Sequence, residues 1–266
     1  MTIRIVTDSA CDLPQYIVDQ HKISIVPLSV RFGEHEFIDR QDLTTEQFWK
    51  RCDSSPVLPE TAAPSPGQFE AEFRKLAAEG ATGIVMISLS GILSATMQSA
   101  ELAAKAVAGH ISVRVVDSRS GSMGQGITVI ACAKLAETGA SLDEVVATGE
   151  SLANRSKVWG ALDTLENLKK GGRIGGAKAM MASALSIKPI IEVVDGKIEE
   201  GGKQRTRSKA LAFLIEKVRD AGPIENLAVL QANCNDFEAF VESLREIYSG
   251  DIIVGDIGPI IGTHTG

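Results

Sequence analysis

Hydroxyl, imidazole and guanidinium side chains gather in polar or glycine-rich segments of the sequence. These segments cover residues 7–9, 59–66, 88–99, 171–176 and 258–266. Each stands at the end of a predicted strand or helix, which is where α/β proteins commonly build ligand sites. Side chains of these types can hold a carboxylate or a phosphate through hydrogen bonds and charge.

Ser94 and Thr61 are hydroxyl side chains placed for a polar ligand. Ser94 begins a predicted helix directly after the strand and loop that end in SLSGIL. Its hydroxyl and the free N–H groups of that helix start can hold an anion, and the plainer alternative is a helix cap without a ligand. Thr61 lies in a rigid loop between Pro59 and Pro64. Such a loop can fix a hydroxyl, although many simply connect elements.

His264 and Arg173 are surrounded by glycine. In GPIIGTHTG, which ends in Gly266, glycines allow a backbone to approach the neighbourhood of His264 closely, and a structural histidine is the alternative. Arg173 stands in GGRIGG and can face a carboxylate or phosphate with two hydrogen bonds. The GGRIGG segment itself is either a phosphate cradle or a helix end followed by a turn.

Two further patterns each leave two interpretations open. Lys203, Arg205 and Arg207 form a basic cluster in GGKQRTR, which is either a docking patch or a solvated strand end. Ser94, Asp256 and His264 follow the chain order of the triad in α/β-hydrolases, but the strained Gly-x-Ser-x-Gly elbow is absent around Ser94. We therefore expect no catalytic residues and treat a serine esterase acting on lipids as the alternative.

The composition argues against several classes of function. The chain has 266 residues, and 27 basic against 34 acidic side chains give a net charge of −7, so we expect no nucleic-acid partner. The cysteines Cys11, Cys52, Cys132 and Cys234 stand far apart, so we expect no metal site and reduced thiols in a cytoplasmic protein. No signal peptide and no membrane-spanning run is evident.

Short apolar runs alternate with segments of helical periodicity, which predicts an α/β fold with a mostly parallel sheet covered by helices. Asp195-Gly196 predicts a hairpin between the strands at 187–194 and 197–200. We therefore expect antiparallel pairing only in the second half. The predicted domains are residues 1–155, a three-layer α/β/α unit, and residues 156–266, a smaller α/β unit with a mixed sheet.

Local signals set the predicted element ends. Ser65 with Gln68 and Ser141 with Glu144 form capping boxes that predict helix starts. Asp12 is expected to cap a helix with Pro14 in its first turn. One strand is expected over residues 23–30.

These segments together resemble the DegV family. IRIVTDSACDLP resembles the family's first strand and loop, TAAPSP stands where the family usually reads TSQPS, and LSATMQSA resembles LSGTYQSA. LKKGGRIG, GGKQRTRSKAL and GPIIGTHTG match three further family segments in order. The resemblance covers essentially the whole chain.

The resemblance implies a function. Characterised members of the family are fatty-acid-binding subunits of bacterial fatty acid kinase, with the acyl chain in a tunnel between two domains. It implies that Thr61, Ser94 and His264 surround the carboxylate of a long-chain fatty acid. Arg173 would support phosphoryl transfer by a separate kinase subunit, and Arg205 would help to dock that kinase. The chain would then be a non-catalytic carrier with no cofactor and at most transient membrane contact.

The chain departs from the family pattern near the expected carboxylate. Ala62 and Ala63 replace the usual polar pair, and Ala95 and Met97 replace Gly and Tyr. The sequence also stops at Gly266, where the family usually continues to a last strand, so it is either cut short or unusual at this end. A binding protein for another small carboxylate is a further alternative.

The sequence alone does not decide which residues would line such a tunnel. Apolar side chains near the polar segments fit either tunnel walls or an ordinary core; they are Ile92, Leu93, Met97, Met180 and Met181.

Overall fold

The amino-terminal half is built around a parallel sheet, with strand order β2-β1-β6-β7. The computed structural model describes residues 2–182 and 187–266. The sheet strands are β1 (Ile3–Asp8), β2 (Ser24–Val26), β6 (Gly83–Ser88) and β7 (Val113–Asp117). Every residue of β6 is buried, as expected of a central strand with helices on both faces.

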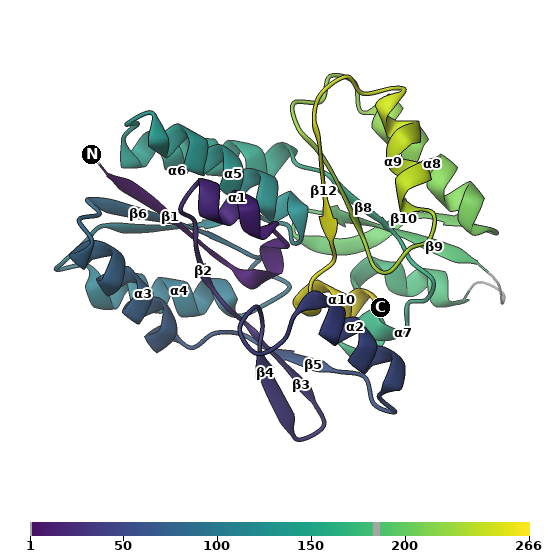
Figure 1. Cartoon of the computed structure of the whole chain (residues 1–266), viewed down its shortest axis with the longest axis horizontal. Coiled ribbons are helices and arrows are strands. Elements are labelled where there is room, and N and C mark those ends of the chain that lie inside the picture. Colours follow the sequence, from purple (N-terminus) through teal and green to yellow (C-terminus); the bar gives the residue numbers. More distant parts are fainter. Residues whose placement is uncertain (1, 183–186) are drawn as a thin grey trace.

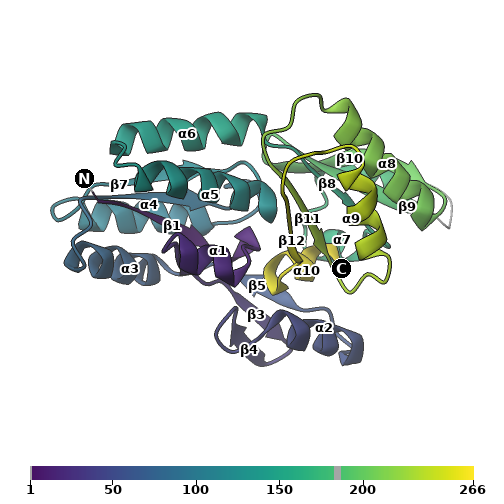
Figure 2. The same cartoon turned by 45° about the horizontal axis from the view of Figure 1, so that its top comes forward.

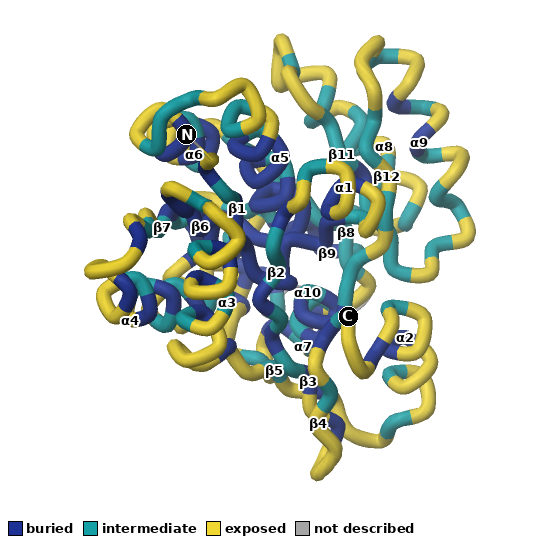
Figure 3. The backbone as a smooth tube through the Cα atoms, turned by 60° about the vertical axis from the view of Figure 1, so that its left-hand side comes forward, coloured by how far each residue is buried: buried dark blue, intermediate teal, exposed yellow. Residues whose placement is uncertain are grey.

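Helices cover both faces of this sheet, so the predicted three-layer arrangement is confirmed (Figure 1). One face packs against α3 (Pro66–Ala78) and α4 (Thr96–Val107). The other packs against three helices: α1 (Gln15–Gln20), α5 (Met123–Glu137) and α6 (Leu142–Arg155). Figure 3 shows buried backbone at this sheet and on the inner sides of its helices.

The two capping boxes predicted from sequence are present. In each, the serine side chain accepts from the backbone N–H three residues on, and the Gln or Glu side chain accepts from the serine N–H. Ser65 begins α3 in this way, and Ser141 begins α6. The boxes satisfy amide groups that a helix start otherwise leaves without partners.

A small antiparallel sheet in the first half corrects two predictions. Its strands are β3 (Ser29–Phe32), β4 (His35–Ile38) and β5 (Glu60–Ala62), in the order β4-β3-β5, and α2 (Thr45–Ser54) lies between β4 and β5 in the chain. A single strand over 23–30 was therefore wrong. Pro27, which has no N–H to donate, separates β2 from β3. The expectation of antiparallel pairing only in the second half was also wrong.

The second half has both antiparallel and parallel strand pairings, in two separate sheets. An antiparallel sheet has the order β10-β9-β8, from β8 (Val158–Ala161), β9 (Lys188–Val194) and β10 (Lys197–Gln204). Asp195 and Gly196 both have positive φ, at 50° and 79°, so the predicted hairpin is confirmed. A parallel pair, β11 (Leu227–Gln231) with β12 (Ile252–Asp256), lies beside it. The domain boundary at residue 155 stays a prediction.

Four helical segments accompany these strands: α7 (Glu166–Lys170), the 3₁₀ helix η2 (Gly175–Ala182), α8 (Arg207–Asp220) and α9 (Phe237–Arg245). Helix α8 is packed sparsely, since Ala210 is the buried residue among its fourteen. Figure 3 shows mostly intermediate and exposed backbone along α8 and α9, with buried segments in α9, where Val241 and Leu244 are buried. In the described ranges 2–182 and 187–266, no helix has the length and apolar character needed to span a bilayer.

A last helix, α10 (Pro259–Thr265), was missing from the sequence prediction. It contacts α2, β3 and β5, which belong to the first half of the chain, as well as α7 (Figures 1 and 2). A Cβ on Gly262 would lie 2.8 Å from the Phe48 ring and 2.9 Å from the Trp49 ring. The Trp49 indole donates a hydrogen bond to the carbonyl of Ile257. The end of the chain is therefore packed tightly onto its beginning.

Asp12 does not cap α1, which corrects another prediction. Helix α1 begins after Pro14 without a side-chain cap, and Asp12 has a positive φ of 50°. Its carboxyl oxygens accept hydrogen bonds from the Ser122 hydroxyl, at 2.6 Å, and from the Gly258 N–H, at 3.0 Å. Asp12 thus joins the loop after β1 to the start of α5 and to the residue before α10.

Three carboxyl groups are buried in this region. Burial raises the pKa of Asp8 from 3.8 to about 6, that of Asp12 to about 7 and that of Asp39 to about 6, because it removes the water that stabilises the charged form. One oxygen of Asp39 has no hydrogen-bond partner among the described residues. These groups make the stability of the fold depend on pH.

We predict that these three carboxyls make the free energy of unfolding fall as pH rises from about 4 to about 7, by more than the lowered pKa of His264 raises it over the same interval. Over this interval the folded protein keeps protons on these carboxyls that the unfolded chain, with its lower pKa, has already lost. Urea unfolding at a series of pH values measures the slope. Asp39→Asn should make the slope shallower, and an unchanged slope in this variant would contradict the burial of an ionisable Asp39.

Candidate ligand-binding site

A cavity of about 520 Å³ lies where the two halves of the chain meet. Its volume is in the range typical of small-molecule sites. Apolar side chains from both halves line it, among them Leu28, Leu89, Ile191, Leu211, Leu214 and Phe237. Residues 211 and 214 belong to helix α8, so part of the apolar face of this helix borders the cavity.

Thr61, Ser94, Arg173 and His264, all singled out from the sequence, line this same cavity. Thr61 is on β5, Ser94 precedes α4, Arg173 follows α7 and His264 is on α10. The Thr61 Oγ1 and His264 Nε2 atoms are 2.9 Å apart. The Ser94 hydroxyl is 2.9 Å from the Thr96 hydroxyl and accepts from the Thr96 N–H. The structure therefore brings together four polar groups from four separate segments.

His264 is neutral over the ordinary pH range. Burial, together with the positive charge of Arg173, lowers the pKa of His264 from 6.5 to about 4. When Nε2 carries the proton, the ring donates to Thr61, and the Thr61 hydroxyl hydrogen is then free for an acceptor in the cavity. A neutral imidazole beside hydroxyl groups can thus orient donors toward a carboxylate.

Arg173 supplies a positive charge at the exposed side of the cavity. Its Nε donates to the Leu93 carbonyl at 3.0 Å, and its Nη1 donates to the Gly171 carbonyl at 2.6 Å. The guanidinium thereby ties the end of α7 to the loop that carries Ser94. It has further N–H groups for an anion, since a guanidinium has five donors.

GGRIGG forms a helix end, not a phosphate cradle, at its first three residues. The N–H groups of Gly171, Gly172 and Arg173 donate to the carbonyls of Asn167, Lys169 and Leu168. Gly172 has a φ of +71°, and the bonds of residues 172 and 173 form the Schellman pattern that ends many helices. These N–H groups are already used and cannot surround a phosphate.

Gly171 also sets the place of the His264 ring. A Cβ at residue 171 would lie 2.4 Å from His264 Nδ1, which is closer than any real contact. His264 Nδ1 is buried and has no hydrogen-bond partner among the described residues. The absence of a side chain at Gly171 is therefore a condition for the observed imidazole position, and the sequence alone gave no sign of it.

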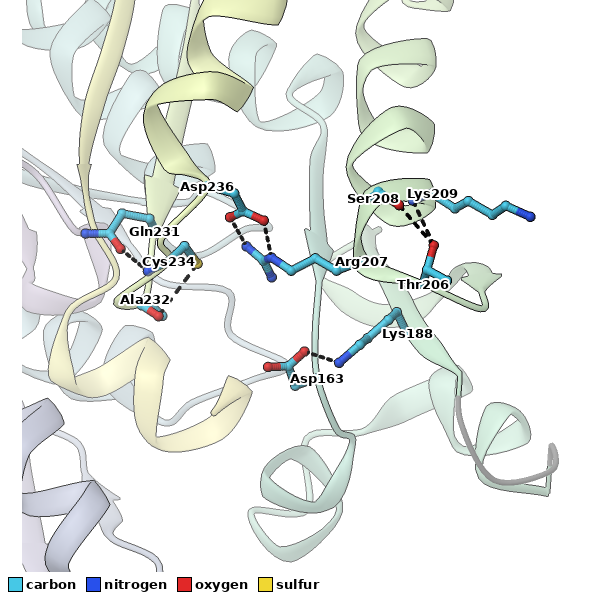
Figure 4. Close-up of polar contacts among 10 residues, drawn as sticks. All are labelled: Asp163, Lys188, Thr206, Arg207, Ser208, Lys209, Gln231, Ala232, Cys234 and Asp236. Atoms are coloured by element: carbon cyan, nitrogen blue, oxygen red, sulfur yellow. Dashed lines mark hydrogen bonds and ion pairs between the residues drawn. The ribbon is translucent and has the colours of Figure 1, made fainter.

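The three residues of the basic cluster have different surroundings. Arg205 is exposed, and Lys203 pairs with Glu200 at 3.1 Å. Arg207 makes two hydrogen bonds to Asp236, at 2.5 and 2.7 Å, joining α8 to the start of α9 (Figure 4). Arg207 and Asp236 line the cavity, and sequence reasoning did not place them there.

The apolar residues named from the sequence as possible tunnel lining lie in different places. Leu93 lines the cavity, whereas Met180 is buried in the core beside Leu168 and Ile174, with Met181 packed against it. Ile92 and Met97 line a second hollow, which shares Leu93, Ser94 and Arg173 with the cavity.

Ser94, Asp256 and His264, which follow the chain order of a hydrolase triad, do not form a triad in the described part of the chain. The carboxyl of Asp256 accepts from Gln231, and His264 contacts Thr61 instead. Within residues 2–182 and 187–266 there is also no cluster of His, Cys, Asp or Glu side chains able to hold a metal ion.

Comparisons with known proteins agree on one family. Residues 2–266 match the family model described as an uncharacterised protein of the DegV family. A DegV domain-containing protein of Streptomyces coelicolor is 36% identical, over 99% of this chain and 95% of the relative. A solved DegV family protein from Thermus thermophilus, described by its fatty acid binding, has 34% identity and a TM-score of 0.88, covering 100% of this chain and 96% of that one. A stearic-acid-binding protein from Eubacterium ventriosum has 26% identity and a TM-score of 0.91, covering 99% and 94%.

We predict that Gly171→Ala displaces the His264 ring and raises its pKa from about 4 toward the ordinary value of 6.5. The added methyl group removes the ring from its buried position, and water then stabilises the protonated form. An NMR titration of the imidazole C–H protons measures this change. Gly109→Ala is the matched control, because a Cβ there meets no atom within 4 Å. An unchanged His264 titration in Gly171→Ala would refute the steric argument.

Proposed function

The chain belongs to the DegV family, and from this premise we propose that it is a carrier that buries the chain of a long fatty acid. The observation that supports this most is the joint composition of the cavity: apolar walls, with Thr61, Ser94, Arg173 and His264 on its lining. A fatty acid has the same division into a long apolar chain and one polar end.

Burial of the acyl chain supplies most of the binding free energy in this proposal. Each methylene removed from water contributes about 0.8 kcal/mol, so roughly ten of them contribute about 8 kcal/mol. That is comparable with the loss of translational and rotational freedom on association, which costs about 4–15 kcal/mol. The polar groups then orient the carboxylate, and the apolar contacts of the remaining methylenes of the fatty acid add affinity.

Thr61, Ser94 and His264 hold the carboxylate in this proposal. The two hydroxyls donate hydrogen bonds, the neutral imidazole orients the Thr61 hydroxyl by donating to it, and Arg173 supplies the opposite charge. Fatty acid binding by the Thermus thermophilus relative, whose fold this chain shares at 34% identity, supports the assignment. The stearic-acid-binding relative supports a long chain as ligand.

The carrier presents the carboxylate to a partner kinase, which phosphorylates it to an acyl phosphate. Arg173, at the exposed side of the cavity, supports the incoming phosphoryl group, and the exposed Arg205 is a docking residue for the kinase. The chain itself is not the catalyst of that phosphorylation and needs no cofactor. We place it in the cytoplasm, with at most transient membrane contact when a lipid is exchanged.

Native mass spectrometry tests the carrier proposal. Protein stripped of lipid and then incubated with palmitate or oleate should gain one fatty acid per chain. The proposal fails if no adduct forms, or if short polar carboxylates such as succinate displace the fatty acid at equal concentration. That second result would favour a binding protein for another small carboxylate.

We predict that Ser94→Ala weakens fatty acid binding about 10- to 100-fold, because a hydrogen bond to a charged group contributes about 1.5–3 kcal/mol. Ser94 lies outside α4, and its hydroxyl accepts one hydrogen bond from the N–H of Thr96, the first residue of that helix, so the melting temperature should fall only by the loss of that one bond. Ser99→Ala, on α4 and outside the cavity lining, is the control. Equal affinities for both variants, or a large loss of stability in Ser94→Ala alone, would leave Ser94 only a structural role.

A further inference from the structure

Ser122 has a backbone conformation that its residue type rarely adopts. It links β7 to α5, directly before Met123, with φ of 50° and ψ of −143°. A positive φ at a residue with a side chain is uncommon and costs free energy, so it persists only where the surroundings enforce it. Such strained residues gather at functional sites, and the carrier function makes no use of Ser122.

The side chain of Ser122 has an acidic partner. Its hydroxyl donates to Asp12 Oδ2 at 2.6 Å, a short hydrogen bond between two buried groups. Asp12 is itself held by the N–H of Gly258, which donates to its other oxygen. A serine hydroxyl bonded to a fixed carboxylate is a potential nucleophile with a base already in place.

The residues two before and two after Ser122 are small, and they need to be. A Cβ on Gly124 would lie 2.1 Å from the Ser120 hydroxyl oxygen and 2.4 Å from Val158 Cγ2. Strand, sharp turn, strained serine and helix, with small flanking residues, are the features of a nucleophile elbow. The segment differs from Gly-x-Ser-x-Gly in its first position, where Ser120 stands in place of glycine.

Ser122 also lies on the proposed lipid cavity. Ser122, Met123 and Gly124 are part of its lining, as are Leu89 and Ile261. Gly121 approaches both of those side chains, since a Cβ there would lie 2.9 Å from Leu89 and 3.4 Å from Ile261. The elbow is therefore next to α10, the helix that also carries His264, and it borders the space that an acyl group would occupy.

We propose that Ser122 and Asp12 form a catalytic dyad that hydrolyses long-chain acyl esters bound in this cavity. This activity goes beyond carriage, and it requires only that the cavity accept an acyl chain. Ser122 is the nucleophile and Asp12 is the general base. The N–H of Met123, the first residue of α5, has no acceptor within its helix and lies directly after the nucleophile, where an oxyanion donor is needed.

The reaction consumes one ester and one water. Ser122 Oγ attacks the ester carbonyl carbon while Asp12 takes the hydroxyl proton, and the proton then passes to the leaving alcohol as the ester C–O bond breaks. Water attacks the resulting acyl-serine, Asp12 takes one proton from that water, and the proton returns to Ser122 as the fatty acid leaves. The products are a free fatty acid and an alcohol.

Asp12 has a suitable protonation equilibrium for a base near neutral pH. Burial raises its pKa to about 7; among the charged groups nearby, Asp39 raises the pKa and Arg40 lowers it. The base form gains population as pH rises through about 7, so the rate should rise over the same interval.

The test is labelling of the whole chain with an alkyl fluorophosphonate, followed by peptide mapping, and hydrolysis of p-nitrophenyl decanoate. We expect the label on Ser122 and an ester hydrolysis rate that increases between pH 6 and 8. Ser122→Gly removes the hydroxyl but suits the positive φ, and should abolish both signals. Asp12→Asn keeps an acceptor for Gly258 and should lower both rates at least about 100-fold.

Asp39→Asn is the matched control, since it removes a second buried carboxyl that has no hydrogen bond to Ser122. It should retain labelling, with the pH dependence moved to lower pH because Asp39 raises the pKa of Asp12. The proposal is overturned if no label forms on Ser122, or if Ser122→Gly hydrolyses the ester as fast as the wild-type chain. Either result leaves the carrier function intact, provided that native mass spectrometry still detects the bound fatty acid. If the wild-type chain binds no fatty acid, the carrier proposal is refuted instead.

Discussion

The packing of α10 against the first half of the chain is the constraint on which the site depends. Gly262 leaves room for Phe48 and Trp49 of α2, and the Gly258 N–H is held by Asp12. With both ends of the helix fixed, His264 reaches Thr61, although the two are more than 200 residues apart in the sequence. A ligand at these two side chains therefore contacts a junction between the beginning and the end of the chain.

The two proposed chemistries share this junction but place different demands on it. Carriage requires groups that hold a carboxylate without changing it, and a neutral His264 between Thr61 and Gly171 has that character. Ester cleavage requires an activated hydroxyl, and Ser122 is bonded to a carboxyl group instead of an imidazole. If both proposals hold, one part of the cavity wall binds a free carboxylate and another part cleaves an ester, and the chemical form of the bound acyl group would decide which is used.

Sequence reasoning identified elements whose signals are local. The capping boxes at Ser65 and Ser141 and the Asp195-Gly196 turn each depend on side chains within three residues of one another. The sheet of β3, β4 and β5 and the helix α10 escaped prediction because they are short and are stabilised by distant partners. The approach of Thr61 to His264 followed from family resemblance, whereas the roles of Gly171, Arg207 and Asp12 needed coordinates, since each depends on contacts across the fold.

The position of α8 beside the cavity has a consequence for the stability of the fold. Ile215 and Val218 of this helix pack against a buried cluster of β11 and α9, whereas Leu211 and Leu214 border the cavity. A hydrocarbon guest would complete that interior and serve as a replaceable part of the hydrophobic core. The free energy of unfolding would then differ between the protein with a bound guest and the protein without one. Cellular quality control would therefore act on two forms of unequal stability.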